Sequence, residues 1–109
     1  MALTSWSIAS FPNADPGTST TETLELLDSA TNTIILLSLI IANNDAAAAA
    51  VTVQRLSSAD AVKMQWSLSI PAGNSPVAID SKMVFAGGDK LAVISDRKNV
   101  TVDASGDES

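Results

Sequence analysis

The chain of 109 residues contains no cysteine, no histidine and no tyrosine. Without cysteine it forms neither a disulfide framework nor a thiolate metal site. Without histidine it lacks the general base of serine and cysteine hydrolases and the imidazole ligands of zinc sites. These absences exclude the commonest nucleophilic and zinc-dependent enzymes.

Aromatic residues are also scarce: they make up 4% of the chain, against 46% for hydrophobic residues as a whole. The core must therefore be built from aliphatic side chains, each stabilising the fold by about 1.5–3 kcal/mol when fully buried. A domain of this length folds without metal or disulfide links. We expect its stability to be modest, so that packing against a partner would increase it.

Basic residues are few and scattered, with six Lys and Arg against twelve Asp and Glu and a net charge of −6. Nucleic acids and anionic membranes bind clusters of positive charge, so we expect no nucleic acid and no membrane as partner. The most apolar segment, residues 34–42, is far shorter than the roughly 20 residues of a membrane-spanning helix. The first residues show no basic region followed by a long apolar one, which predicts no signal peptide.

Short apolar runs separated by turn residues recur at intervals of about ten residues from residue 20 onward. This spacing predicts an all-β fold: a single antiparallel β-sandwich or jelly-roll-like domain of about seven or eight short strands, with an extended N-terminal arm. The nearly continuous Ile and Leu of residues 34–41 indicate a strand buried on both faces. The sequence VAIDSKMVF predicts two short strands, or one that bends at Asp80 and Ser81.

The ends of the chain differ in composition from its middle. Residues 1–19 include two prolines and a glycine among small polar residues, which indicates the N-terminal arm. Residues 20–104 are expected to form the β-sandwich domain, and residues 105–109 a flexible acidic tail. The arm either reaches a neighbouring molecule or lies over its own domain.

The alanines of residues 46–50 are open to three interpretations: helix, loop or strand. Alanine has the highest helix propensity, and Asp45 is a suitable helix cap. The β-branched residues Val51, Thr52 and Val53 follow at once, however, and favour a strand with an alanine-rich lead-in. The small side chains of the alanines would let another surface approach closely.

The candidate partner-binding residues come from these two segments. Buried Trp is common among binding hot spots, so Trp6 is a candidate anchor in a partner's pocket, although a place in its own core is equally open. The full set is Leu3, Trp6, Ile8, Phe11, Ala47, Ala48 and Ala49.

The remaining candidates for chemistry are carboxylates. A pair of them could act as acid and base on a sugar, drawn from Glu22, Glu25, Asp28, Asp80 and Asp89. Sugar sites are usually lined by aromatic residues, and this chain has only four, Trp6, Phe11, Trp66 and Phe85. A calcium site is conceivable at Asp80, Asp89, Asp96 and Asp103, which recur near predicted strand ends. Aspartate in turns also binds its own backbone, which explains these positions without a metal. We therefore expect no enzyme, no catalytic residues, no metal and no cofactor.

The order of elements and several short motifs resemble those of small β-sandwich virion structural proteins of tailed bacteriophages. The similarity covers residues 20–102 and includes the sequences IANND, IPAG and VAIDSKMVFAGGDKLAVIS. The resemblance implies a non-enzymatic protein of the virion, assembled in the host cytoplasm, that binds the major capsid protein or other virion proteins. A capsid decoration (cement) protein that stabilises the head is favoured, and a homo-oligomer, preferably a trimer, is implied by analogy. The alternatives are a neck or tail component, or a module that binds carbohydrate or a receptor.

Overall fold

The computed structural model describes residues 2–15, 18–24, 33–73, 76–79, 83–85 and 88–108. These residues form nine β-strands and no helix, which confirms the predicted all-β class. Accordingly, the described part of the chain offers no helix that could cross a membrane. The strands are β1 (Ala2–Ile8), β2 (Thr20–Leu24), β3 (Ile34–Asn43), β4 (Ala49–Leu56), β5 (Val62–Ile70), β6 (Val77–Ile79), β7 (Met83–Phe85), β8 (Lys90–Ser95) and β9 (Val100–Glu108).

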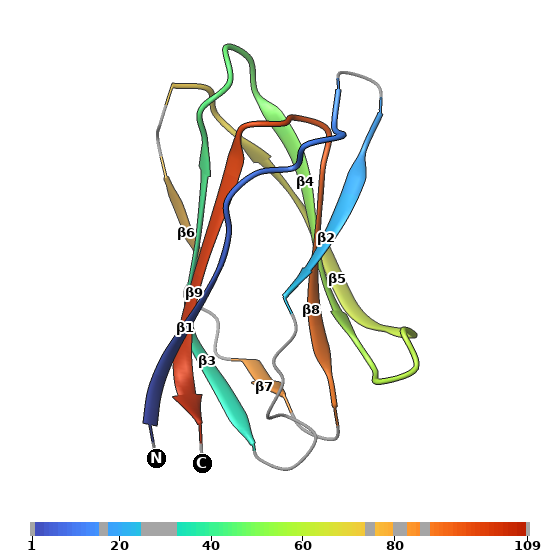
Figure 1. Ribbon diagram of the computed structural model, residues 1–109, viewed down its shortest axis with the longest axis vertical. Coiled ribbons are helices and arrows are strands. Elements are labelled where there is room, and N and C mark those ends of the chain that lie inside the picture. Colours follow the sequence, from blue (N-terminus) through green and yellow to red (C-terminus); the bar gives the residue numbers. More distant parts are fainter. Residues whose placement is uncertain are drawn as a thin grey trace.

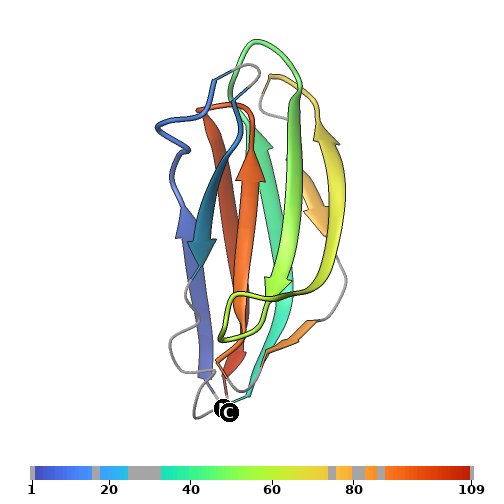
Figure 2. The same ribbon diagram turned by 90° about the vertical axis from the view of Figure 1, so that its right-hand side faces the viewer.

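The strands form two antiparallel sheets that pack face to face as a β-sandwich (Figure 1). The five-stranded sheet has the order β1-β9-β3-β6, and β7 also pairs with β3. The four-stranded sheet has the order β2-β8-β4-β5. The molecule is elongated along its strands, with extents of 40 × 25 × 20 Å (Figure 2).

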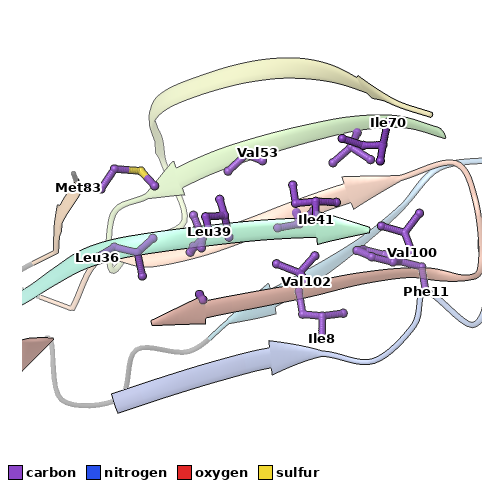
Figure 3. Close-up of a cluster of buried hydrophobic side chains, with 14 of the residues drawn as sticks. Ile8, Phe11, Leu36, Leu39, Ile41, Val53, Ile70, Met83, Val100 and Val102 are labelled. Atoms are coloured by element: carbon purple, nitrogen blue, oxygen red, sulfur yellow. The ribbon is translucent and has the colours of Figure 1, made fainter. Parts of the chain in front are cut away.

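Aliphatic side chains fill the space between the sheets, as the composition predicts (Figure 3). Because side chains alternate along a strand, every second residue of β4 and β9 points inward, and β3 follows the same rule on either side of an irregularity between Leu36 and Ser38. Ile41 of β3, Val53 of β4 and Val102 of β9 are all completely buried. Two of the four aromatic residues, Phe11 and Phe85, are completely buried as well.

The prediction that β3 is buried on both faces is wrong. Its inward residues are covered, but Leu37 and Ile40 are 38% and 39% exposed. Leu37 is the extra residue of a β-bulge, because Leu36 lies opposite Gly106 and Ser38 lies opposite Ser105. The nearly continuous apolar run therefore reflects apolar residues on the outward side of β3 as well as on its inward side.

Of the two interpretations of the N-terminal arm, the structure agrees with the second, in which it belongs to its own domain. Residues 2–8 form β1, which pairs with β9 from Ala2 opposite Glu108 to Ile8 opposite Val102. Phe11 follows in the core, and its main-chain N–H donates a hydrogen bond of 2.8 Å to the oxygen of Lys98. Proline is expected to prevent strand pairing because it lacks an N–H donor. Pro12, however, lies in an exposed turn beyond the strand, where no hydrogen bond between strands is lost.

The prediction of a flexible acidic tail at residues 105–109 is wrong for residues 105–108. Strand β9 continues to Glu108 and pairs with both β1 and β3, so residues 105–108 lie within the sheet. Ser109 lies outside the described residues. Small residues in a strand do not prevent pairing when both neighbours supply hydrogen bonds, which is the physical reason for the difference.

Residues 46–50 contain no helix. A bend at residues 45–47 leads into β4, which begins at Ala49, so the strand with an alanine-rich lead-in is confirmed. The segments VAI and MVF form two separate strands, β6 and β7. The predicted bend at Asp80 and Ser81 lies outside the described residues.

Candidate functional site

Three of the predicted partner-binding residues belong to the core of the domain. Phe11 is completely buried, Ala49 is 1% exposed and Ile8 is 8% exposed, and all three lie in the central hydrophobic cluster. Their burial corrects the prediction, because residues covered by their own chain present no surface to another molecule in the folded state.

Of the other predicted residues, Trp6, Ala47 and Ala48 are less buried. Trp6 lies opposite Ala104 and packs half-buried against the core, which is the second of its two interpretations. Ala47 is half-buried, and its main-chain oxygen accepts a hydrogen bond from Asn43, whereas Ala48 is exposed. Leu3 lies on β1 opposite Asp107. The structure therefore does not bring the seven residues together into one surface.

Asp89 is the buried carboxylate among the described residues, with 4% of its surface exposed. Its Oδ1 lies 2.9 Å from Nζ of Lys63, and its Oδ2 lies 3.5 Å from Nε of Arg55. The Arg55 guanidinium also lies 6.0 Å from the centre of the Phe85 ring. Asp89 thus links β4 and β5 to the beginning of β8, and its carboxylate is neutralised by two cations.

The other carboxylates that the structure describes do not converge on a site. Asp96 accepts a hydrogen bond of 2.8 Å from the main-chain N–H of Ala50, and Asp103 lies exposed on β9. Glu22 is half-buried on β2. Within the described residues no three acidic, histidine or cysteine side chains gather closely enough to hold a metal ion. The remaining candidates, Glu25, Asp28 and Asp80, lie outside the described residues.

Exposed apolar side chains provide a different kind of candidate. In the described part of the chain, the large exposed hydrophobic residues are Leu37, Ile40, Val62, Met64 and Val84. They fall into two groups by strand: three lie on β3 and β7 of the five-stranded sheet, and two lie on β5 of the four-stranded sheet. Single exposed hydrophobic residues are normal on a protein surface, but grouping on a flat sheet is typical of a binding surface.

We define the outer face as the surface of the five-stranded sheet that points away from the core. Strand register places Ser7, Asp103, Ile40 and Ala78 side by side across it, on β1, β9, β3 and β6. A second row consists of Ser5, Ser105 and Ser38, and a third joins Asp107, Ile35 and Val84.

Small side chains make the outer face flat. Between Ile40 and β1 this face has a shallow hollow with a volume of about 380 Å³. Its lining includes Ser5, Ser7, Ser38, Asp103 and Ser105. Ile40, which is 39% exposed, lies at this hollow. Val84, which is 49% exposed, lies in the third row. The outer face therefore combines apolar side chains, small hydroxyl groups and the carboxylates of Asp103 and Asp107.

The second group lies on β5, where exposure falls along the strand. Val62 and Met64 are 51% and 48% exposed, Trp66 and Leu68 are half-buried, and Ile70 is completely buried. Met64, Trp66 and Leu68 lie opposite Arg55, Val53 and Val51, so they point to the core side of the sheet. The apolar and polar residues of the sequence MQWSLSI thus alternate between the two faces of the sheet, and burial of the apolar residues increases along the strand.

Sequence reasoning missed Leu37, Ile40 and Val84. An apolar residue at almost every position of β3 showed that both faces are apolar, but it did not show whether the same chain covers both. Comparison with protein-family models and with curated proteins finds no match for this chain.

Proposed function

We propose that this protein is a non-enzymatic structural component of a tailed-phage virion that binds another virion protein through its outer face. Within that role we favour capsid decoration, in which many copies bind the shell and stabilise the head. A neck or tail component is the alternative within the same class.

The observation that carries the proposal is the exposure of Leu37, Ile40 and Val84 on one side of the five-stranded sheet. Burying an exposed aliphatic side chain stabilises a complex by about 25 cal/mol for each Å² removed from water. Flat sheet surfaces with small neighbouring side chains allow a partner's backbone or side chains to approach closely. The serines and Ala78 around Ile40 provide such neighbours.

The charges of the outer face define the partner. Asp103 is exposed beside Ile40, and Asp107 lies beside Ile35. A partner that places aliphatic side chains on Ile40 and Val84, with Lys or Arg opposite the two aspartates, would match both features. The major capsid protein is the partner expected for a decoration protein.

Repetition supplies the mechanism of stabilisation. A contact of about 1.4 kcal/mol changes its own equilibrium tenfold, and a bound protein that touches several capsid subunits multiplies such contributions. The resemblance of residues 20–102 to small β-sandwich virion proteins supports this role.

The copy number in purified particles tests the proposal. Quantitative mass spectrometry should detect the protein in virions of the phage whose genome encodes it. A copy number close to that of the major capsid protein means decoration, whereas one close to that of a tail ring means a neck or tail position. Absence from the particles contradicts the proposal.

Variants of the outer face test the surface itself. Ile40→Asp and Val84→Asp should prevent or strongly weaken incorporation into particles, because each buries a charge opposite an apolar partner. Thr21→Asp, on an exposed position of β2 in the other sheet, is the matched control and should incorporate normally. Glycan binding by the isolated protein, together with normal incorporation of both variants, would favour a receptor-binding module instead.

A further inference from the structure

Strand β5 ends the four-stranded sheet, so one of its edges carries main-chain N–H and C=O groups that no other strand of the described residues pairs with. At nine residues, Val62–Ile70, it is a long edge strand. Such edges tend to pair with another chain unless they are short, bulged, covered or charged.

The usual protection by charge is weak on β5. Its one charged residue is Lys63, and the ammonium group of Lys63 is held 2.9 Å from Asp89 of the same chain. The only irregularity in its pairing with β4 lies at one end, between Arg55 and Leu56. From Met64 to Ile70 the strand is regular, and three of its core-side residues, Met64, Trp66 and Leu68, remain partly uncovered.

The other edges of the sandwich are less suitable. β6 and β7 have three residues each. β1 and β2 contact each other along one side of the molecule, where the two sheets come together (Figure 2). β2 also carries Glu22, which would face a negatively charged copy of the same chain.

Charge favours β5 as the place where two copies meet. Each copy has a net charge of −6, so most orientations of two copies are repulsive. β5 contains no carboxylate, and the nearby Lys63 and Asp89 neutralise each other.

The residue pattern of β5 is self-complementary. A two-fold axis perpendicular to the sheet keeps each face on its own side, so it pairs core-side residues with core-side residues. With the axis at Trp66, the middle residue of the strand, Met64 faces Leu68 of the second copy and Gln65 faces Ser67. Apolar residues then meet apolar ones, and polar residues meet polar ones.

We propose that two copies of this chain pair antiparallel through β5, with the two-fold axis at Trp66, and form one continuous eight-stranded sheet from two four-stranded sheets. The pairing satisfies the free edge and covers the exposed part of Met64 on both copies. A two-fold contact closes after two copies, so the expected assembly is a dimer and not the trimer implied by the resemblance. This inference is independent of the partner that binds the outer face.

Light scattering coupled to size-exclusion chromatography, at protein concentrations up to about 1 mM, measures the assembly of the unmodified protein. We expect a concentration-dependent equilibrium between monomer and dimer. A monomer throughout this range, or a trimer, would overturn the proposal.

Paired charge substitutions test the register. The double variant Gln65→Lys with Ser67→Lys places lysine opposite lysine twice, whereas Gln65→Lys with Ser67→Glu places lysine opposite glutamate twice. We expect the dissociation constant of the first to exceed that of the second by about tenfold or more. The first variant also lowers the net negative charge, so general repulsion works against this result and only local pairing produces it. Both variants remove the same side-chain hydrogen bonds to Gln54 and Thr52, which makes them matched, and circular dichroism confirms that both fold. Equal dissociation constants would overturn the proposed pairing.

The absence of cysteine permits a second, geometric measurement. An equimolar mixture of Gln65→Cys and Ser67→Cys proteins should form a disulfide-linked heterodimer under mild oxidation, because these positions face each other. Either variant alone should crosslink far less. Efficient crosslinking of one variant with itself would place the axis elsewhere and contradict the proposal.

Discussion

The side-chain amide of Asn43 donates a hydrogen bond to the main-chain oxygen of Ile70, with 3.1 Å between Nδ2 and oxygen. Asn43 is the last residue of β3 and Ile70 the last of β5, so the bond joins the two sheets at one end of the sandwich. The same amide donates to the oxygen of Ala47 at 2.8 Å, and its Oδ1 accepts from the N–H of Asp45 at 3.0 Å. A completely buried asparagine thus holds the alanine-rich lead-in against both sheets.

Replacing Asn43 by alanine should lower the free energy of unfolding by about 2–4 kcal/mol, because it removes the donor of a buried hydrogen bond to Ile70 and of a partly buried one to Ala47. Urea denaturation followed by fluorescence of the two tryptophans measures this change. Asn44→Ala, at the exposed neighbouring position, should change the stability by no more than about 0.5 kcal/mol. Similar values for the two variants would show that the amide bonds contribute little.

Phe11→Ala should destabilise the protein by about 3–5 kcal/mol, because it opens a cavity where a completely buried ring packed. If residues 1–19 were an arm outside the domain, the same substitution would leave the unfolding midpoint unchanged. Asn13→Ala, in the exposed turn two residues later, serves as the control. Thermal melting of the three proteins separates these outcomes.

Asp89→Asn should cost about 2 kcal/mol, because it leaves Arg55 and Lys63 facing a neutral group in a largely buried position. Both cations are partly exposed, at 25% and 44%, which keeps the cost below that of a fully buried pair. Asp60→Asn removes the ion pair with Lys90 but concerns a carboxylate that is 69% exposed, so we expect a change below about 0.5 kcal/mol. Denaturant unfolding of both variants should show this difference, and equal effects would contradict it.

Gly106→Ala should destabilise the sandwich by about 3 kcal/mol. A Cβ at this position would lie 2.4 Å from the main-chain oxygen of Ile35, where the bulge of β3 brings the two backbones close. Gly73→Ala is the informative comparison, because it meets no atom within 4 Å but has a φ of +87°. Backbone strain alone should cost about 1 kcal/mol there. In calorimetry, Gly106→Ala should therefore lower the melting temperature more than Gly73→Ala does.

Much of the fold follows from residue patterns. The alternation of MQWSLSI indicates which side chains of β5 point inward, and the apolar run KLAVIS coincides with β8. Turn residues such as those at 96–99 correctly separate β8 from β9. These local signals succeed because strand periodicity and turn geometry depend on neighbouring residues only.

The edges of the fold were harder to predict. Nothing local shows that residues 2–8 will pair with residues 102–108, because that contact joins the two ends of the chain. The candidate surface was missed for a related reason. Whether Ile40 is covered depends on what packs on the outer face, and that is a property of the whole assembly.

The pairing of Ala2 with Glu108 places both ends of the chain at the same pole of the molecule (Figures 1 and 2). A fluorescent protein or affinity tag fused to either end would thus project from that pole and leave the opposite loops unobstructed. Dyes attached to both ends would report directly on the separation of β1 from β9, which makes the chain suited to single-molecule pulling in which its first strand is unzipped from its last.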